Sequence, residues 1–126
     1  MKVIENYGRA IESSDENLFK EIFAPQVLVE VPAGASADHP ANTVAHILSQ
    51  VAKTAPGIKR ALTADAGNNW HFLVFEGQLE GEKLQAIDQV HLNKDGKIDH
   101  IIIYMRPLPV AQKFAEAISQ RLQPRK

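Results

Sequence analysis

Apolar residues near the amino terminus recur at the three- and four-residue spacing of one face of an α-helix. This spacing runs through residues 3–11, and the segment stops at Ser13 and Ser14. Ser13 and Glu16 have the spacing of a capping box, which predicts the start of a second helix with Pro25 beyond its end. Two short helices are therefore predicted before the first strand.

The pattern then changes to alternation of apolar and other residues over 26–31, which predicts a strand that Pro32 breaks. Residues 34–43 (GASADHPANT) have the composition of a loop. Apolar positions over 44–51 predict a third helix, which ends before Pro56.

Residues 58–106 lack helical periodicity and are interrupted by the turn-like sequences GNN, EG and NKDG. They predict three or four antiparallel strands, and a final helix is expected over 109–122. Helices followed by an antiparallel meander indicate an α+β domain in which the helices cover one face of a curved sheet. Such packing leaves a cone-shaped space, which side chains fill or which stays open as a pocket.

Composition restricts the class of protein. The chain has 126 residues, 44% of them hydrophobic, which suits one domain spanning 1–126 with one core. The 14 basic residues are scattered among 15 acidic ones, so nucleic acid is not an expected partner. The absence of cysteine excludes disulfides, thiolate nucleophiles and Cys-ligated zinc. No segment resembles a signal peptide or approaches transmembrane length, so a cytoplasmic protein with no membrane partner is expected.

Asp88 is the unexpected residue in AIDQVHL, residues 86–92, where alternation predicts a strand. Strands disfavour Asp, and an ionised carboxylate that faces an apolar interior loses its hydration. Asp88 either faces water or pairs with an arginine, or it has a function. In an apolar pocket its pKa would rise, and the protonated carboxyl could donate a hydrogen bond.

A resemblance to a known family rests on the stretch YGRAIESSDENLFKEIFAPQVLVEVP, which starts at Tyr7, and on NKDGKI and IIIYMRPL in the second half. Together these segments resemble the nuclear transport factor 2-like (NTF2-like) superfamily, in particular its ketosteroid isomerase-like and SnoaL-like polyketide cyclase branches with their many uncharacterised bacterial members. The resemblance covers almost the whole chain. It implies a cystatin-like α+β roll, in which a cone-shaped, curved antiparallel sheet wraps around the amino-terminal helices.

The resemblance also implies roles for individual residues. Tyr7 lies where the isomerases have their oxyanion-hole tyrosine, and Asp88 lies where they have the acid that donates a second hydrogen bond. Two such donors suit a carbonyl oxygen that gains negative charge as an enolate forms. The position of the isomerase general base holds Val31, and alternation directs the adjacent Glu30 to the opposite face. Loss of a general base costs about 10² to 10⁴ in rate, so steroid isomerisation is disfavoured.

His71 is the candidate replacement for that base, because alternation groups it with Leu73 and Phe75 on the face that the resemblance places inward. His39, His91 and His100 are weaker candidates for the base. None of these three histidines, nor His46, has the HExxH spacing of a zinc site. No metal and no cofactor are therefore expected. The predicted catalytic residues are Tyr7, Asp88 and His71, and the predicted substrate-pocket residues are Val31, Leu73, Phe75, Val90, Ile101, Ile103 and Met105.

The gapless apolar run IIIYM predicts a strand buried on both faces, so the outer side of the sheet should be covered. In this superfamily the cover is commonly an identical chain, which implies a homodimer with Trp70, Phe72, Ile102 and Tyr104 at its interface.

Three functions remain open from the sequence. The chain could be an isomerase or cyclase acting on a hydrophobic carbonyl, phenolic or polycyclic compound, a non-catalytic protein that binds such a small hydrophobic molecule, or a dimerising module with a closed core. A cavity of several hundred Å³ shared by Tyr7 and Asp88 would separate the first two from the third.

Overall fold

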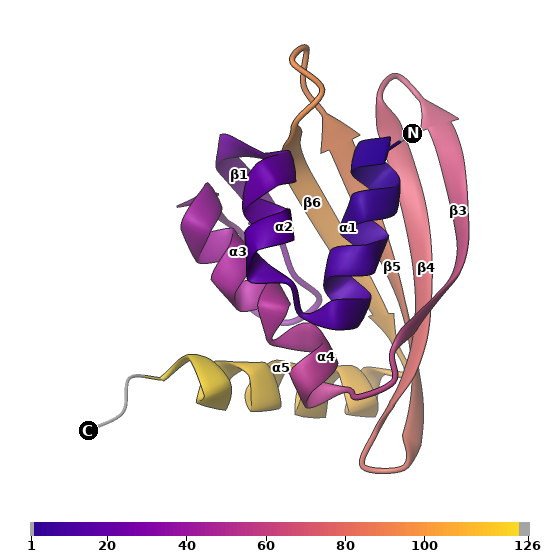
Figure 1. The fold of residues 1–126 in the computed structure, drawn as a ribbon. Helices are drawn as coiled ribbons and strands as arrows, with labels where there is room; N and C mark the ends of the chain where they lie inside the picture. Colours follow the sequence, from indigo (N-terminus) through magenta and orange to yellow (C-terminus); the bar gives the residue numbers. More distant parts are fainter. Residues whose placement is uncertain (1, 124–126) are drawn as a thin grey trace.

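Residues 2–123, the part of the chain that the structure describes, form five helices and six strands in the computed structural model (Figure 1). Two helices precede the sheet, two more lie between its strands along the chain, and the last follows the sheet. The elements are α1 (Lys2–Ser13), α2 (Glu16–Ile22), β1 (Phe23–Glu30), β2 (Ala37–Pro40), α3 (Ala41–Ser49), α4 (Val51–Thr54), β3 (Lys59–Gly67), β4 (Trp70–Leu79), β5 (Glu82–Leu92), β6 (Ile98–Arg106) and α5 (Leu108–Leu122).

The strands form one curved sheet in the order β2-β1-β6-β5-β4-β3. The α+β class is confirmed, as is the last helix. The sequence predicts three or four strands between residues 58 and 106, and the structure has four. The expected sheet is antiparallel throughout, but β1 runs parallel to β6. The chain between these two strands passes through α3, α4 and four other strands, so β6 returns beside β1 in the same direction.

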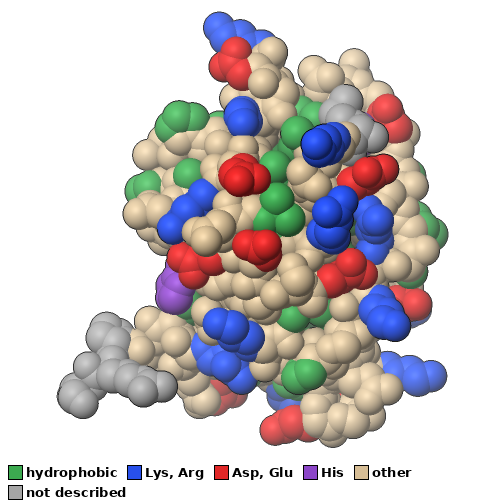
Figure 2. Space-filling view, in the orientation of Figure 1, with side chains coloured by type: hydrophobic (Ala, Val, Ile, Leu, Met, Phe, Trp, Pro, Cys, Tyr) green, Lys and Arg blue, Asp and Glu red, His purple; other side chains and the backbone are tan. Residues whose placement is uncertain are grey.

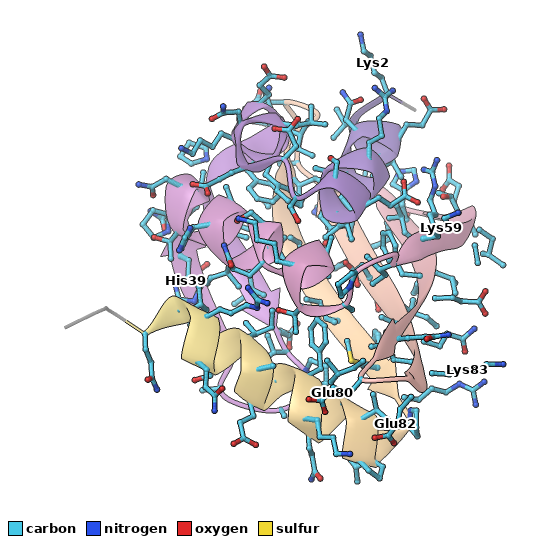
Figure 3. All side chains as sticks on the ribbon, turned by 60° about the horizontal axis from the view of Figure 1, so that its bottom comes forward. Lys2, His39, Lys59, Glu80, Glu82 and Lys83 are labelled. Carbon is cyan, nitrogen blue, oxygen red and sulfur yellow. The ribbon has the colours of Figure 1, made fainter. Side chains whose placement is uncertain are left out.

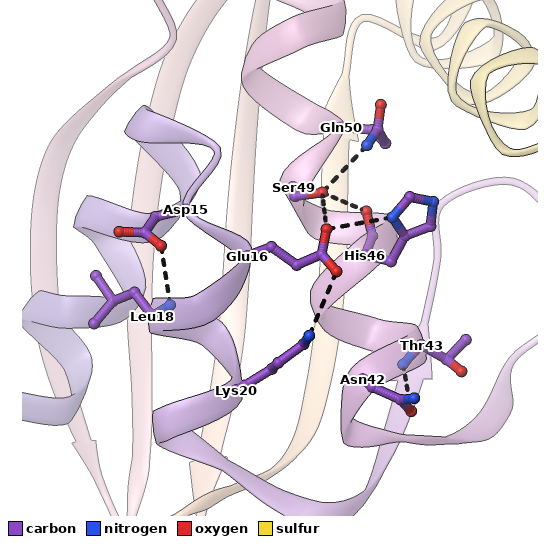
Figure 4. Close-up of polar contacts among 9 residues, drawn as sticks. All are labelled: Asp15, Glu16, Leu18, Lys20, Asn42, Thr43, His46, Ser49 and Gln50. Atoms are coloured by element: carbon purple, nitrogen blue, oxygen red, sulfur yellow. Dashed lines mark hydrogen bonds and ion pairs between the residues drawn. The ribbon is translucent and has the colours of Figure 1, made fainter.

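Three local predictions are wrong. Asp15, not Ser13, caps α2, because the Asp15 carboxylate accepts a 3.1 Å bond from the Leu18 amide (Figure 4). Ser13 ends α1, where its hydroxyl donates to the Arg9 carbonyl oxygen. The expected loop over 34–43 contains β2, which pairs with the free edge of β1. The expected third helix is two helices, α3 and α4, separated at Gln50.

The core lies between the helices and the inner face of the sheet. Tyr7 on α1 and Phe19 on α2 are fully buried, with ring centroids 5.8 Å apart in an edge-to-face arrangement. Helix α5 crosses one end of the sheet and buries Val110, Ala111 and Phe114 there (Figure 1). The sheet and the helices on its inner face therefore surround the cone-shaped space, and α5 closes one end of it (Figure 1).

The surface over the helices carries charges of both signs at short intervals (Figure 2). Glu16 of α2 makes a 3.4 Å contact with His46 Nδ1, which connects α2 to α3 (Figure 4). Within residues 2–123, no helix has both the length and the apolar character needed to span a bilayer.

Candidate functional site

Tyr7 and Asp88 meet inside the core, although 81 positions separate them along the chain. Tyr7 lies on the apolar stripe of α1 with Ile4 and Ile11, which turns its ring toward the sheet. Asp88 alternates with Ala86 and Val90 on the inner face of β5. The Tyr7 hydroxyl donates a 2.6 Å hydrogen bond to Asp88 Oδ2, and the two residues are 0% and 4% exposed.

This environment shifts both pKa values. Burial raises the pKa of Asp88 to about 6, while the hydrogen bond from Tyr7 lowers it. Burial also raises the pKa of Tyr7 well above its usual value, and the Asp88 charge and hydrogen bond raise it further. Tyr7 is therefore a neutral donor, and Asp88 can gain or lose a proton close to neutral pH.

The pair adjoins a small hollow of about 40 Å³. Asp88 lines this hollow together with apolar side chains from the sheet and from four helices, whereas Tyr7 is not among its lining residues. Tyr7 is therefore placed to hold the carboxyl group, and Asp88 is the group that a molecule in the hollow would contact. A space of this size accommodates a water molecule, while sites for drug-sized ligands measure several hundred Å³. The expected large pocket is not confirmed.

The predicted pocket residues divide into three sets. Phe75, Ile103 and Met105 line the hollow. Val31 lies past the end of β1 and is 38% exposed, outside the hollow, because the strand ends at Glu30 before the alternation reaches it. Leu73, Val90 and Ile101 are fully buried in the core without lining the hollow.

His71 lies on the inner face of β4, as alternation predicts, and is 7% exposed. It pairs across the sheet with Val90, while Asp88 pairs with Leu73 in the next inward-facing row. Among the described residues, the structure shows no hydrogen bond between His71 and Tyr7 or Asp88. A role for His71 as a base stays a prediction.

The outer face of the sheet carries two histidine–carboxylate pairs that sequence reasoning missed. His91 Nδ1 lies 2.7 Å from Asp99 Oδ1, and His100 Nε2 lies 2.7 Å from Glu30 Oε2. The Trp70 ring packs against both imidazoles. Because Glu30 is engaged there, it does not supply the base at the inner site. Only the strand register, which places His91 opposite His100, could have revealed this cluster.

A second group of residues has the composition of a hydrolase triad but lacks its geometry. The Ser49 hydroxyl donates to the backbone carbonyl oxygen of His46 at 2.7 Å, and the His46 ring faces Glu16 (Figure 4). A nucleophilic serine instead donates to the imidazole of its base. Within residues 2–123, no group of three or more His, Asp or Glu side chains is arranged to hold a metal ion.

Comparison with protein-family models gives no match, and no curated protein matches the sequence. Solved structures do match. An uncharacterised protein with a cystatin-like fold from Silicibacter pomeroyi superposes with a TM-score of 0.87 at 20% identity, over 94% of this chain and 84% of that one. A steroid delta-isomerase from Pseudomonas aeruginosa has a TM-score of 0.84 at 21% identity, over 96% and 89%.

A putative polyketide cyclase from Sinorhizobium meliloti is more distant, with a TM-score of 0.65 at 19% identity over 82% of this chain and 94% of that one. Other matching proteins are described as NTF2-like. The superpositions show a shared fold, and identities this low support no conclusion beyond the fold. This chain therefore has the NTF2-like, cystatin-like α+β fold, as the sequence resemblance implied.

Proposed function

We propose that the chain binds a small, largely apolar molecule through one hydroxyl or carbonyl oxygen, which hydrogen-bonds to Asp88. The observation that carries this proposal is the buried Tyr7–Asp88 pair at the edge of an apolar hollow. A carboxyl group whose pKa is raised by burial lowers the stability of the fold near neutral pH. Perturbed carboxyl groups of this kind are concentrated at functional sites.

Binding requires the hollow to expand, because about 40 Å³ does not admit an organic ligand. Phe114 of α5 is the side chain whose movement would open it, since it lines the hollow at the end that α5 closes. Two polar side-chain contacts among the described residues attach this helix to the rest of the chain, from Lys113 to Glu82 at 2.6 Å and from Arg121 to the Lys53 carbonyl oxygen at 2.9 Å. Displacement of α5 would therefore break few polar contacts.

Phenol and toluene test this proposal, because they have similar shapes and only phenol carries a hydroxyl. Phe114→Ala enlarges the hollow, and Phe114→Leu does so with less risk to folding. NMR titrations should show phenol binding more tightly than toluene, and Asp88→Asn should remove most of that difference. Ile118→Ala is the control, since Ile118 packs on the core from α5 without lining the hollow. Equal binding of the two probes, or none even in the enlarged variants, would contradict the proposal.

Proton transfer is the second candidate function, and the raised pKa of Asp88 favours it. A group with a pKa of about 6 is well matched to accept and return a proton near neutral pH. Asp88 would then supply the base that the chain lacks at Val31, with Tyr7 as a neighbouring donor. The fold shared with a steroid delta-isomerase and a putative polyketide cyclase supports this candidate. This candidate function predicts that the rate of isomerisation of a β,γ-unsaturated ketone rises with pH, with a midpoint near pH 6. It also predicts that the activity is lost in Asp88→Asn.

We also propose that the outer face of the sheet pairs with a second copy of the chain. Trp70, Phe72 and Ile102 are half-buried there, and Tyr104 is 49% exposed. Large apolar side chains grouped on one face of a sheet are ordinarily covered by another layer. The small size of the hollow agrees with such an assembly role, which does not need a ligand. This dimer involves residues separate from Tyr7 and Asp88, so both proposals can hold together.

A further inference from the structure

A hollow of ligand size lies outside the core, at the end of the sheet near the β4–β5 turn. It measures about 920 Å³ and opens to solvent. Its polar side chains come from neighbouring positions on four adjacent strands, β3, β4, β5 and β6. We call this hollow the trough, and its polar lining residues are Lys59, Glu76, Gln78, Lys83, Gln85 and Arg106.

The register of the strands determines which charged side chains are neighbours in the trough. Lys59 pairs with Glu76 across β3 and β4, so these two charges offset each other. Gln85 pairs with Glu76 on one side and with Arg106 on the other. Lys83 lies two residues before Gln85, on the same face of β5. Diagonal neighbours of this kind lie about 7 to 8 Å apart, so the side chains of Lys83 and Arg106 can reach one small ligand.

Arg106 is held in place by its neighbour. The Arg106 Nε donates a 2.9 Å hydrogen bond to Gln85 Oε1, and Gln85 Nε2 donates to Glu76 Oε2 at 3.4 Å. This chain of contacts leaves both terminal amino groups of Arg106 available for a planar or tetrahedral oxyanion. Within residues 2–123, neither Lys83 nor Arg106 forms an ion pair.

Apart from Glu76, which Lys59 offsets, the carboxylates nearest to the trough are directed elsewhere. Glu82 binds Lys113 of α5 at 2.6 Å. Figure 3 shows Glu80 and Glu82 on the side of α5, while Lys83 extends away from that helix. Two positive charges without an acidic partner among the described residues therefore remain in a hollow large enough for a small molecule.

We propose that the trough binds the phosphate group of a small organic ligand between Lys83 and Arg106. A dianionic phosphate matches the two charges, and its oxygens match the two free amino groups of Arg106 and the ammonium of Lys83. Two neighbouring cations at one end of the sheet favour a small molecule over the long phosphate backbone of a nucleic acid, which needs a wider basic surface. The trough shares no lining residue with the inner hollow, so this inference stands apart from the ligand site proposed at Asp88. Arg106 and Gln85 share the outer face of the sheet with Tyr104 and Gln89, so the trough lies at one end of the face proposed to pair with a second copy.

Titration of the ¹⁵N-labelled chain with phenyl phosphate, inorganic phosphate and benzoate at constant ionic strength tests the proposal. We expect saturable shifts of the Arg106 Nε signal and of the Gly77 and Leu84 amides with both phosphates, and weaker binding of benzoate. Lys83→Gln and Arg106→Gln should each raise the Kd about 10-fold, the loss expected for one hydrogen bond to a charged group. Both side chains are exposed, so both variants should fold.

Lys2→Gln is the matched control, because it removes the same charge from α1, away from the trough (Figure 3). Its Kd should equal that of the unchanged protein. Shifts that do not saturate would overturn the proposal, as would an equal loss of binding in Lys2→Gln. Tighter binding of benzoate than of phenyl phosphate would overturn the assignment to phosphate.

Discussion

The Tyr7 hydroxyl donates to Asp88 across a gap of 2.6 Å, in a place where neither group meets bulk water. This bond joins the first helix to the middle of the sheet. Since Tyr7 stabilises the ionised form of Asp88 while burial penalises it, the two residues set the protonation of the site together.

Stability should fall as pH rises through the range in which Asp88 titrates. The pKa of Asp88 is raised to about 6 in the folded chain, compared with about 3.9 for an unfolded aspartate. The folded state therefore binds the proton more tightly, and the stability that this proton contributes is complete below pH 4 and is lost as pH rises through about 6. The loss amounts to about 3 kcal/mol.

Urea unfolding of the unchanged protein and of Asp88→Asn at several pH values measures this effect. The asparagine side chain of the variant does not titrate, so the difference in unfolding free energy between the two proteins isolates Asp88. We expect the unfolding free energy of the unchanged protein to fall, relative to that of Asp88→Asn, by about 2 kcal/mol between pH 4 and pH 7. A difference independent of pH would contradict a raised Asp88 pKa.

Removal of the Tyr7 hydroxyl should raise the pKa of Asp88 above 6. Tyr7→Phe deletes the hydrogen bond that favours the carboxylate and leaves the burial that opposes it. A ¹³C NMR titration of the Asp88 carboxyl carbon measures the shift. Tyr104→Phe is the control, because Tyr104 bonds Gln89 on the outer face, away from the pair. An unchanged midpoint in Tyr7→Phe would show that the hydroxyl does not influence the carboxyl group.

The sequence predicts those parts of the fold that local periodicity determines. The stripe on α1, the alternation of β4 and β5 and the limits of α5 all follow from apolar spacing. The contact between Tyr7 and Asp88 could not be predicted from apolar spacing, because a contact between residues 81 positions apart leaves no local pattern. The family resemblance supplied that pairing.

The features of the fold that the sequence does not predict depend on tertiary contacts. Strand β2 forms because β1 offers a free edge, although its own sequence ADHP has the composition of a loop. The parallel pairing of β1 with β6 reflects the path of the chain between them. The volume of the hollow depends on how Phe114 and Met105 fill the cone, which a pattern of apolar and polar residues does not specify.

Gly77→Ala should destabilise the fold, although glycine is usually unfavourable within a strand. A methyl group at this position would lie 3.3 Å from the Ile58 Cα and from two of its side-chain carbons. Because one of these contacts is with backbone, relief requires β4 to move away from the start of β3, and we expect a loss of about 1 to 3 kcal/mol. Thermal and urea unfolding measure the change.

Gly8→Ala is the informative comparison for Gly77→Ala. The added methyl group there would meet Arg60 Nη1 at 3.0 Å, the far end of a flexible side chain that can move aside. Because Gly8 lies inside α1, alanine should gain up to about 1 kcal/mol of helix propensity. Equal losses in both variants would show that the contact with Ile58 backbone is not the cause.

A charge on the outer face of the sheet should separate the proposed dimer. Ile102 lies on this face, opposite Gln89 of β5, and Ile102→Lys would place two like charges between the apolar side chains of the two sheets if two copies pack there. Sedimentation velocity should give twice the 13.9 kDa mass of one chain for the unchanged protein and a single mass for the variant. Leu108→Lys is the control, because Leu108 is 66% exposed at the start of α5, off the sheet. This variant should remain dimeric. A monomeric unchanged protein at high concentration would exclude the pairing and leave the apolar strip exposed for a different partner.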